Sequence, residues 1–73
     1  MRSSSIEIIN LRRELAHQCE TATREWLAAR SVYRRLHEAK VKDFVALRDA
    51  ARRLDVLERG RAALLRDLKA LSD

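Results

Sequence analysis

The chain contains no proline, one glycine, one cysteine and only three aromatic residues. The absence of proline removes the strongest helix breaker from the sequence. A single cysteine excludes a disulfide within the chain, and no cluster of cysteine and histidine indicates a zinc site. No apolar run approaches the ~18 residues of a membrane span. Since a chain of this size buries only about 60% of its unfolded surface, we expect it to gain stability by association.

The sequence also lacks the signatures of an enzyme. Its carboxylates lie among charged helical positions, and no nucleophile–base motif, glycine-rich phosphate loop or HExxH pattern is present. His17 and Cys19 are two residues apart, so they do not face each other on a helix. We therefore expect no catalytic residues, no metal ligands, no cofactor and no small-molecule substrate.

What the chain does contain is an apolar seam with a heptad repeat. Two rows of residues spaced by seven, the second row four residues after the first, are apolar except at Arg12, Lys40, Asp43 and Arg61. A period of about 3.5 residues is typical of long helices packed in a coiled coil or bundle. The predicted helix-packing seam includes Ile8, Leu15, Trp26, Tyr33, Leu36, Leu47, Leu54, Leu57, Leu64, Leu68 and Leu71.

The seam is interrupted near the middle of the chain, at Lys40 and Asp43. Asp43 is a suitable N-cap for a helix that starts at Phe44. We therefore predict an all-α antiparallel helical hairpin within one domain, 1–73. Its helices should span about 5–38 and 44–71, with a turn at 39–43.

Two alternatives to this hairpin are open. Residues 38–43 contain neither glycine nor proline, so the chain could continue as a single straight or kinked helix. Gly60 could end a helix and leave a short third helix behind it. Against that break, the seam continues in phase past Gly60, which favours a glycine tolerated inside a helix at a cost of about 1 kcal/mol.

The start of the first helix has its own signal. Ser4 and Glu7 have the spacing of a capping box, in which each side chain bonds the backbone N–H of the other residue. This motif places the beginning of the helix at about Ser5.

Several apolar residues lie outside the seam, which indicates a second packing surface. Small monomers rarely expose contiguous apolar patches, so we expect a partner protein or a second copy to cover this surface. A homodimer would give a four-helix bundle or coiled-coil-like oligomer. Trp26 and Tyr33 fit either the bundle core or a set of binding anchors. The candidate partner-binding residues are Ile6, Ile9, Trp26, Leu27, Tyr33 and Phe44.

The charged residues give a mixed surface with a net charge of +5, from 16 basic and 11 acidic residues. Candidate contacts to phosphates or to an acidic partner are Arg34, Arg35, Arg52, Arg59 and Arg66. The last three form a line at seven-residue spacing that could follow a phosphate backbone. The eleven acidic residues favour a protein partner over a polyanion.

These observations predict a small, basic, non-catalytic protein-interaction module, such as an adaptor, assembly subunit, co-chaperone or inhibitor. It would present an apolar helix face rimmed by arginines to an acidic partner surface. The alternative is a nucleic-acid-binding helical-hairpin dimer. The first residues lack an uninterrupted apolar segment, which predicts a cytoplasmic protein that does not enter membranes.

Overall fold

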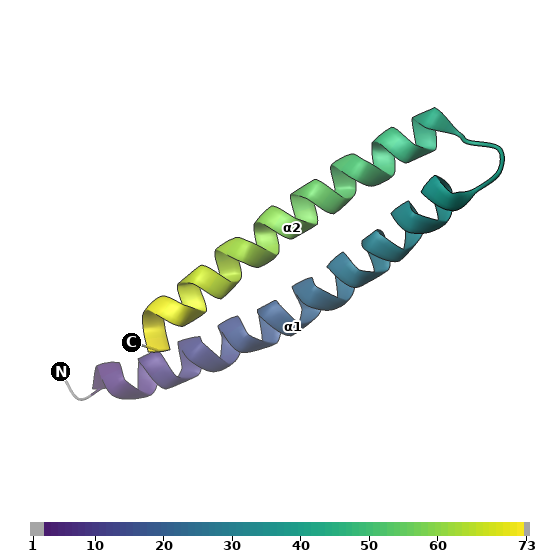
Figure 1. Cartoon of the computed structure of the whole chain (residues 1–73). Helices are drawn as coiled ribbons and strands as arrows, with labels where there is room; N and C mark the ends of the chain where they lie inside the picture. Colours follow the sequence, from purple (N-terminus) through teal and green to yellow (C-terminus); the bar gives the residue numbers. More distant parts are fainter. Residues whose placement is uncertain (1–2, 73) are drawn as a thin grey trace.

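The computed structural model describes residues 3–72 and is an antiparallel pair of helices (Figure 1). Helix α1 spans Ser3–Glu38 and helix α2 spans Phe44–Ser72. Residues 39–43 form a non-helical turn between them. The predicted all-α hairpin is confirmed, and the alternative of one continuous helix is wrong.

Side chains close the turn, which contains neither glycine nor proline. The backbone N–H of Ala46 donates a hydrogen bond of 3.1 Å to Oδ1 of Asp43. The first regular hydrogen bond of α2 runs from the N–H of Leu47 to the carbonyl oxygen of Asp43, at 2.9 Å. On the other side of the turn, the Lys42 ammonium donates to the carbonyl oxygen of His37 in the last turn of α1. Asp43 therefore caps α2, and Lys42 pairs one of the carbonyls that the end of α1 leaves unbonded.

One predicted helix boundary needs correction, and one open alternative is resolved. Helix α1 begins at Ser3, about two residues before the predicted start, and the side chain of Ser4 that would form the predicted capping box lies outside the described part of the chain. Helix α2 runs without a break through Gly60, whose φ angle is not positive. The prediction of a glycine tolerated inside the helix is therefore confirmed, and the alternative of a third helix after Gly60 is wrong.

The core is one narrow strip between the helices. Cys19 and Ala29 are the buried hydrophobic residues of the described chain, each 7% exposed, and no large side chain is fully buried. Ile8, near the open end of the hairpin, is 41% exposed. The other predicted seam residues are half-buried: Leu15, Trp26, Tyr33, Leu36, Leu47, Leu54, Leu57, Leu64, Leu68 and Leu71.

The hairpin is long and thin because the described residues form no third element that could pack on it. Its extents are 60 × 15 × 14 Å. The radius of gyration is 17.0 Å, against about 11 Å for a compact domain of this length. Both flanks of the seam consequently lie at the surface along the whole molecule.

Two of the polar seam positions hold the helices in register. Nε of Arg12 donates a 2.9 Å hydrogen bond to the carbonyl oxygen of Leu71, which Nη2 of Arg12 also contacts. Nε of Arg61 donates a 2.9 Å hydrogen bond to Oγ1 of Thr23. Because long arginine side chains can cover apolar surface while their heads reach polar groups, these positions suit an otherwise apolar seam.

We expect Asp43→Ala to lower the stability of the hairpin by about 1 kcal/mol through loss of the N-cap, or roughly 4–8 °C in melting temperature. Thermal unfolding followed by circular dichroism measures this change. Asp49→Ala is the matched control, because Asp49 lies inside α2 and its carboxylate only pairs loosely with Arg48, at 3.8 Å. Equal losses in the two variants would show that Asp43 does not act as a cap.

Candidate functional site

The seam has two flanks, which we name by one residue each. In an antiparallel helix pair, the residues beside the seam on one helix face their counterparts on the other helix along each flank. The Trp26 side contains Thr23, Leu27 and Arg30 of α1, with Arg61 reaching over from α2. The Gly60 side contains Leu11, Gln18, Glu25 and Val32 of α1 and Arg53, Gly60 and Asp67 of α2.

Trp26 lies between two arginines. The guanidinium carbon of Arg30 is 5.6 Å from the centroid of the indole ring, and that of Arg61 is 5.0 Å from it. Arg30 follows Trp26 by one helical turn on α1, whereas Arg61 comes from α2 and also bonds Thr23. Each cation–π contact contributes about 0.5–1 kcal/mol. The indole therefore joins the two helices through contacts inside the chain.

The two large aromatic side chains of α1 belong to this internal packing. Both Trp26 and Tyr33 are half-buried. The indole N–H of Trp26 is buried and has no hydrogen-bond partner, so cation–π contacts and packing set the position of the ring. The Tyr33 ring lies 5.9 Å from that of His37, at an interplanar angle of 30°.

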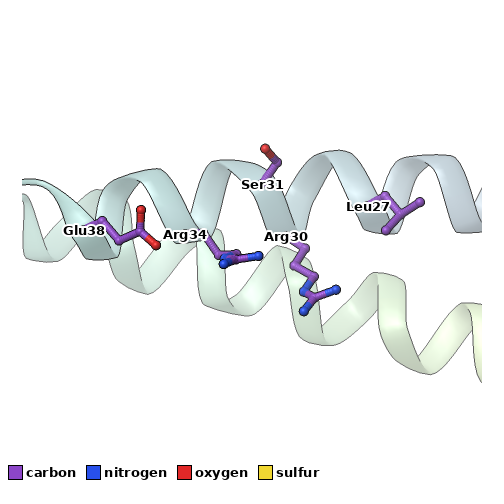
Figure 2. A pocket seen from close by; sticks show the side chains of 5 residues that line it. All are labelled: Leu27, Arg30, Ser31, Arg34 and Glu38. Atoms are coloured by element: carbon purple, nitrogen blue, oxygen red, sulfur yellow. The ribbon is translucent and has the colours of Figure 1, made fainter.

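Beside Trp26, a shallow groove of about 250 Å³ follows α1 (Figure 2). We call it the α1 groove; it is lined by Leu27, Arg30, Ser31, Arg34 and Glu38. Leu27 is 48% exposed, and Figure 2 shows the guanidinium groups of Arg30 and Arg34 on the same side of the helix.

The α1 groove has a positive charge, since its two arginines outnumber its one carboxylate. The ion pairs of the described residues join Arg48 to Asp49 and Arg59 to Asp55. Neither Arg30 nor Arg34 takes part in them. Arg34 therefore remains able to bind a carboxylate from outside the chain, and so does Arg30 through its N–H groups, although its guanidinium also lies over Trp26.

The structure does not gather the predicted partner-binding residues into one patch. Ile6 and Ile9 lie near the open end of the hairpin, while Phe44 is the first residue of α2 at the turn. Ile6 is 65% exposed and Phe44 is 75% exposed. From Ile9 to Leu27 the helix rises about 27 Å. A ligand that touches all of these residues must therefore lie along the hairpin.

The predicted phosphate-contacting arginines are exposed but face several directions. Arg34 and Arg35 are consecutive, so they point about 100° apart around α1. Arg52, Arg59 and Arg66 follow the outer face of α2, opposite the seam, and Nε of Arg59 is 3.3 Å from Oδ2 of Asp55. These residues do not form a single basic surface.

Sequence reasoning missed the Gly60 side, which carries two mostly apolar grooves that span both helices. One groove, of about 370 Å³, lies toward the turn and is lined by Glu25, Ala28, Ala29, Val32, Ala50 and Arg53. The other, of about 390 Å³, lies toward the open end and is lined by Leu11, Leu15, Asp67, Ala70 and Leu71. The seven-residue spacing of these residues within each helix could have indicated the Gly60 side. Only the register of the hairpin, however, shows which residues of the two helices line the same groove.

Within residues 3–72, no group of three or more histidine, cysteine, aspartate or glutamate side chains is arranged to hold a metal ion. None of the helices described there is long and apolar enough to cross a membrane. Comparison with protein families, with curated proteins and with solved structures found no match for this chain.

We expect Arg61→Ala to destabilise the hairpin by about 1–2 kcal/mol, since it removes a cation–π contact with Trp26 and the hydrogen bond to Thr23. Urea unfolding followed by the fluorescence of Trp26, the only tryptophan, measures the change. Arg52→Ala, on the exposed outer face of α2, serves as the control and should leave the midpoint nearly unchanged. Coincident unfolding curves for the two variants would contradict the assigned role of Arg61.

Proposed function

We propose that this chain is a small non-catalytic protein-interaction module, acting as an adaptor, assembly subunit, co-chaperone or inhibitor. It binds an acidic segment of a partner protein through the α1 groove. The observation that carries the proposal is the pairing of a half-exposed Leu27 with two guanidinium groups that form no ion pair within residues 3–72.

The chemistry of the groove suits a partner that offers carboxylates around an apolar side chain. Guanidinium groups bind carboxylates through parallel hydrogen bonds, which are stronger than those between neutral groups. Leu27 supplies apolar area at the centre, and arginine is among the residues enriched in binding hot spots. A helix or extended segment of the partner would contact the α1 groove before it contacts the rest of the Trp26 side.

The rest of the Trp26 side lengthens this contact. Ile6, Ile9 and Phe44 occupy positions beside the seam on the same flank as Leu27. A partner segment lying along the hairpin would cover them in turn and approach the ~800 Å² per partner of a standard stable interface. The groove would then give specificity, and the apolar residues at the two ends would add area.

A protein partner suits this surface better than a nucleic acid. Glu38 lies in the groove itself, and Asp55 already neutralises Arg59 on the outer face of α2. A polyanion is best held by a continuous basic surface, which the dispersed arginines do not provide. We place this activity in the cytoplasm, where a free cysteine such as the buried Cys19 stays reduced.

Reversing the charge of the groove should strongly weaken partner binding. In a pull-down from the native lysate, read by mass spectrometry with and without nuclease, we expect the tagged wild-type chain to retain a stoichiometric protein after nuclease treatment. The variant Arg30→Glu/Arg34→Glu should lose that protein, with affinity reduced by about 100-fold because two charged hydrogen-bond donors are replaced.

The control is Arg59→Glu/Arg66→Glu, which changes the net charge by the same amount on the outer face of α2. It should retain the partner. Equal loss of the partner in both variants would show that binding depends only on the net charge of the chain. That result would contradict a specific contact at the α1 groove. Loss of every bound protein on nuclease treatment would replace the proposal with nucleic-acid binding.

A further inference from the structure

The hairpin exposes more surface than a compact chain of its mass. Its accessible surface is 6094 Å² at 8.5 kDa, about 1,400 Å² more than the roughly 4,700 Å² of a typical folded monomer. A standard interface removes about 800 Å² from each partner. The exposed surface is therefore sufficient for one flank to be covered by a second copy while the other flank remains accessible.

Nothing in the single hairpin requires a glycine at position 60. It is helical and exposed, its φ angle is not positive, and a Cβ atom built there would meet nothing within 4 Å. Glycine destabilises an exposed helix interior relative to alanine. What glycine offers in return is a backbone that another backbone can approach closely. Gly60 is therefore suited to be the crossing point of two helices.

Arg53 and Asp67 are placed symmetrically about Gly60, seven residues before it and seven after it on the same row of α2. Both are exposed, and neither belongs to an ion pair of the described residues. If α2 crosses α2 of a second copy in the antiparallel direction at Gly60, each Arg53 comes opposite an Asp67 of the other copy. Parallel pairing would instead set like charges against each other, which costs stability.

The corresponding row on α1 has the same symmetry. Leu11, Gln18, Glu25 and Val32 are seven residues apart, with a midpoint between Gln18 and Glu25. Antiparallel pairing about this midpoint sets Leu11 against Val32, which are 45% and 44% exposed. It also sets the amide of Gln18 against the carboxylate of Glu25. The present contact of Gln18 is a long 3.5 Å hydrogen bond to Glu14, so its amide can reorient at small cost.

One two-fold axis serves both rows. The 2.9 Å hydrogen bond between Arg61 and Thr23 fixes Gly60 level with the part of α1 between Gln18 and Glu25. The midpoints of the two rows therefore lie at the same height along the hairpin. A two-fold interface requires this self-complementarity, in which each pair of residues occurs twice.

We infer that the chain forms an antiparallel homodimer through its Gly60 side, giving a four-helix bundle in which the two α2 helices cross at Gly60. The groove that contains Arg53 in one copy is covered by the end that contains Asp67 in the other. The Trp26 sides face outward, so the dimer carries two α1 grooves. Because the interface and the α1 groove share no residue, each proposal can fail without the other.

Charge reversal tests the interface. By sedimentation velocity at micromolar to submillimolar concentrations, we expect a dimer for the wild-type chain. Arg53→Asp and Asp67→Arg should each weaken dimerisation at least about tenfold, because each creates two like-charge contacts per dimer. The double variant Arg53→Asp/Asp67→Arg should restore it. Arg52→Asp, one residue away on the outer face, should have no effect.

Two results would overturn the inference: a folded wild-type monomer throughout this range, or a dimer that is equally stable in both single variants. If a single variant unfolds, recovery of both helicity and dimer in the double variant still identifies the pair. If the double variant recovers neither helicity nor the dimer, the pairing of Arg53 with Asp67 is rejected.

Cross-linking tests the crossing point separately. In a Cys19→Ala background, Gly60→Cys should form a disulfide between two copies under mild oxidation, since identical residues on the axis come within the ~4.4–6.8 Å between Cα atoms that a disulfide needs. Ala51→Cys, exposed on α2 outside the interface, is the control and should stay monomeric on non-reducing gels. Equal cross-linking of both variants, or none at Gly60→Cys, would contradict the crossing.

Discussion

The burial of one seam between two helices is the interaction on which the rest of this structure depends. Two helices can only offer each other one strip of surface, so no large side chain of the described residues becomes fully buried. The register between the two helices is consequently fixed by polar side chains at the edges of this strip. Arg12 reaches the carbonyl of Leu71 at the open end, and Arg61 reaches Thr23 near the middle. At the turn, Asp43 caps the start of α2.

A single seam leaves two long flanks, and these differ in chemistry. The Trp26 side carries guanidinium groups beside a half-exposed Leu27, a combination that suits an external acidic partner. The Gly60 side carries charges of both signs and several alanines, and its two rows are complementary to themselves when reversed. On our proposals, a chain of 73 residues uses one flank to gain the stability of a larger core and keeps the other for recognition.

Trp26 illustrates how an apparent binding anchor can be structural. Exposed tryptophans are frequent hot spots, but here Arg30 and Arg61 lie over the ring and the indole N–H is buried. An unbonded buried donor costs about 1–3 kcal/mol, which the cation–π contacts and packing must offset. The neighbouring Leu27 is 48% exposed and is the more accessible of the two.

The sequence by itself determined that the chain forms long helices packed along one seam, because the heptad period is a property of the residue order alone. The interruption at Lys40 and Asp43 favoured a hairpin, and the tertiary structure decided it against one continuous helix. It also indicated correctly that the seam passes through Gly60 in phase. The start of α1 at Ser3 and the unbroken course of α2 were settled only by the fold. The α1 groove combines residues already singled out, such as Leu27 and Arg34, with others that were not. The sequence could not pair Thr23 with Arg61, or align the midpoints of the rows beside Gly60. Those depend on which residues of α1 lie opposite which residues of α2, and only the tertiary structure decides that register.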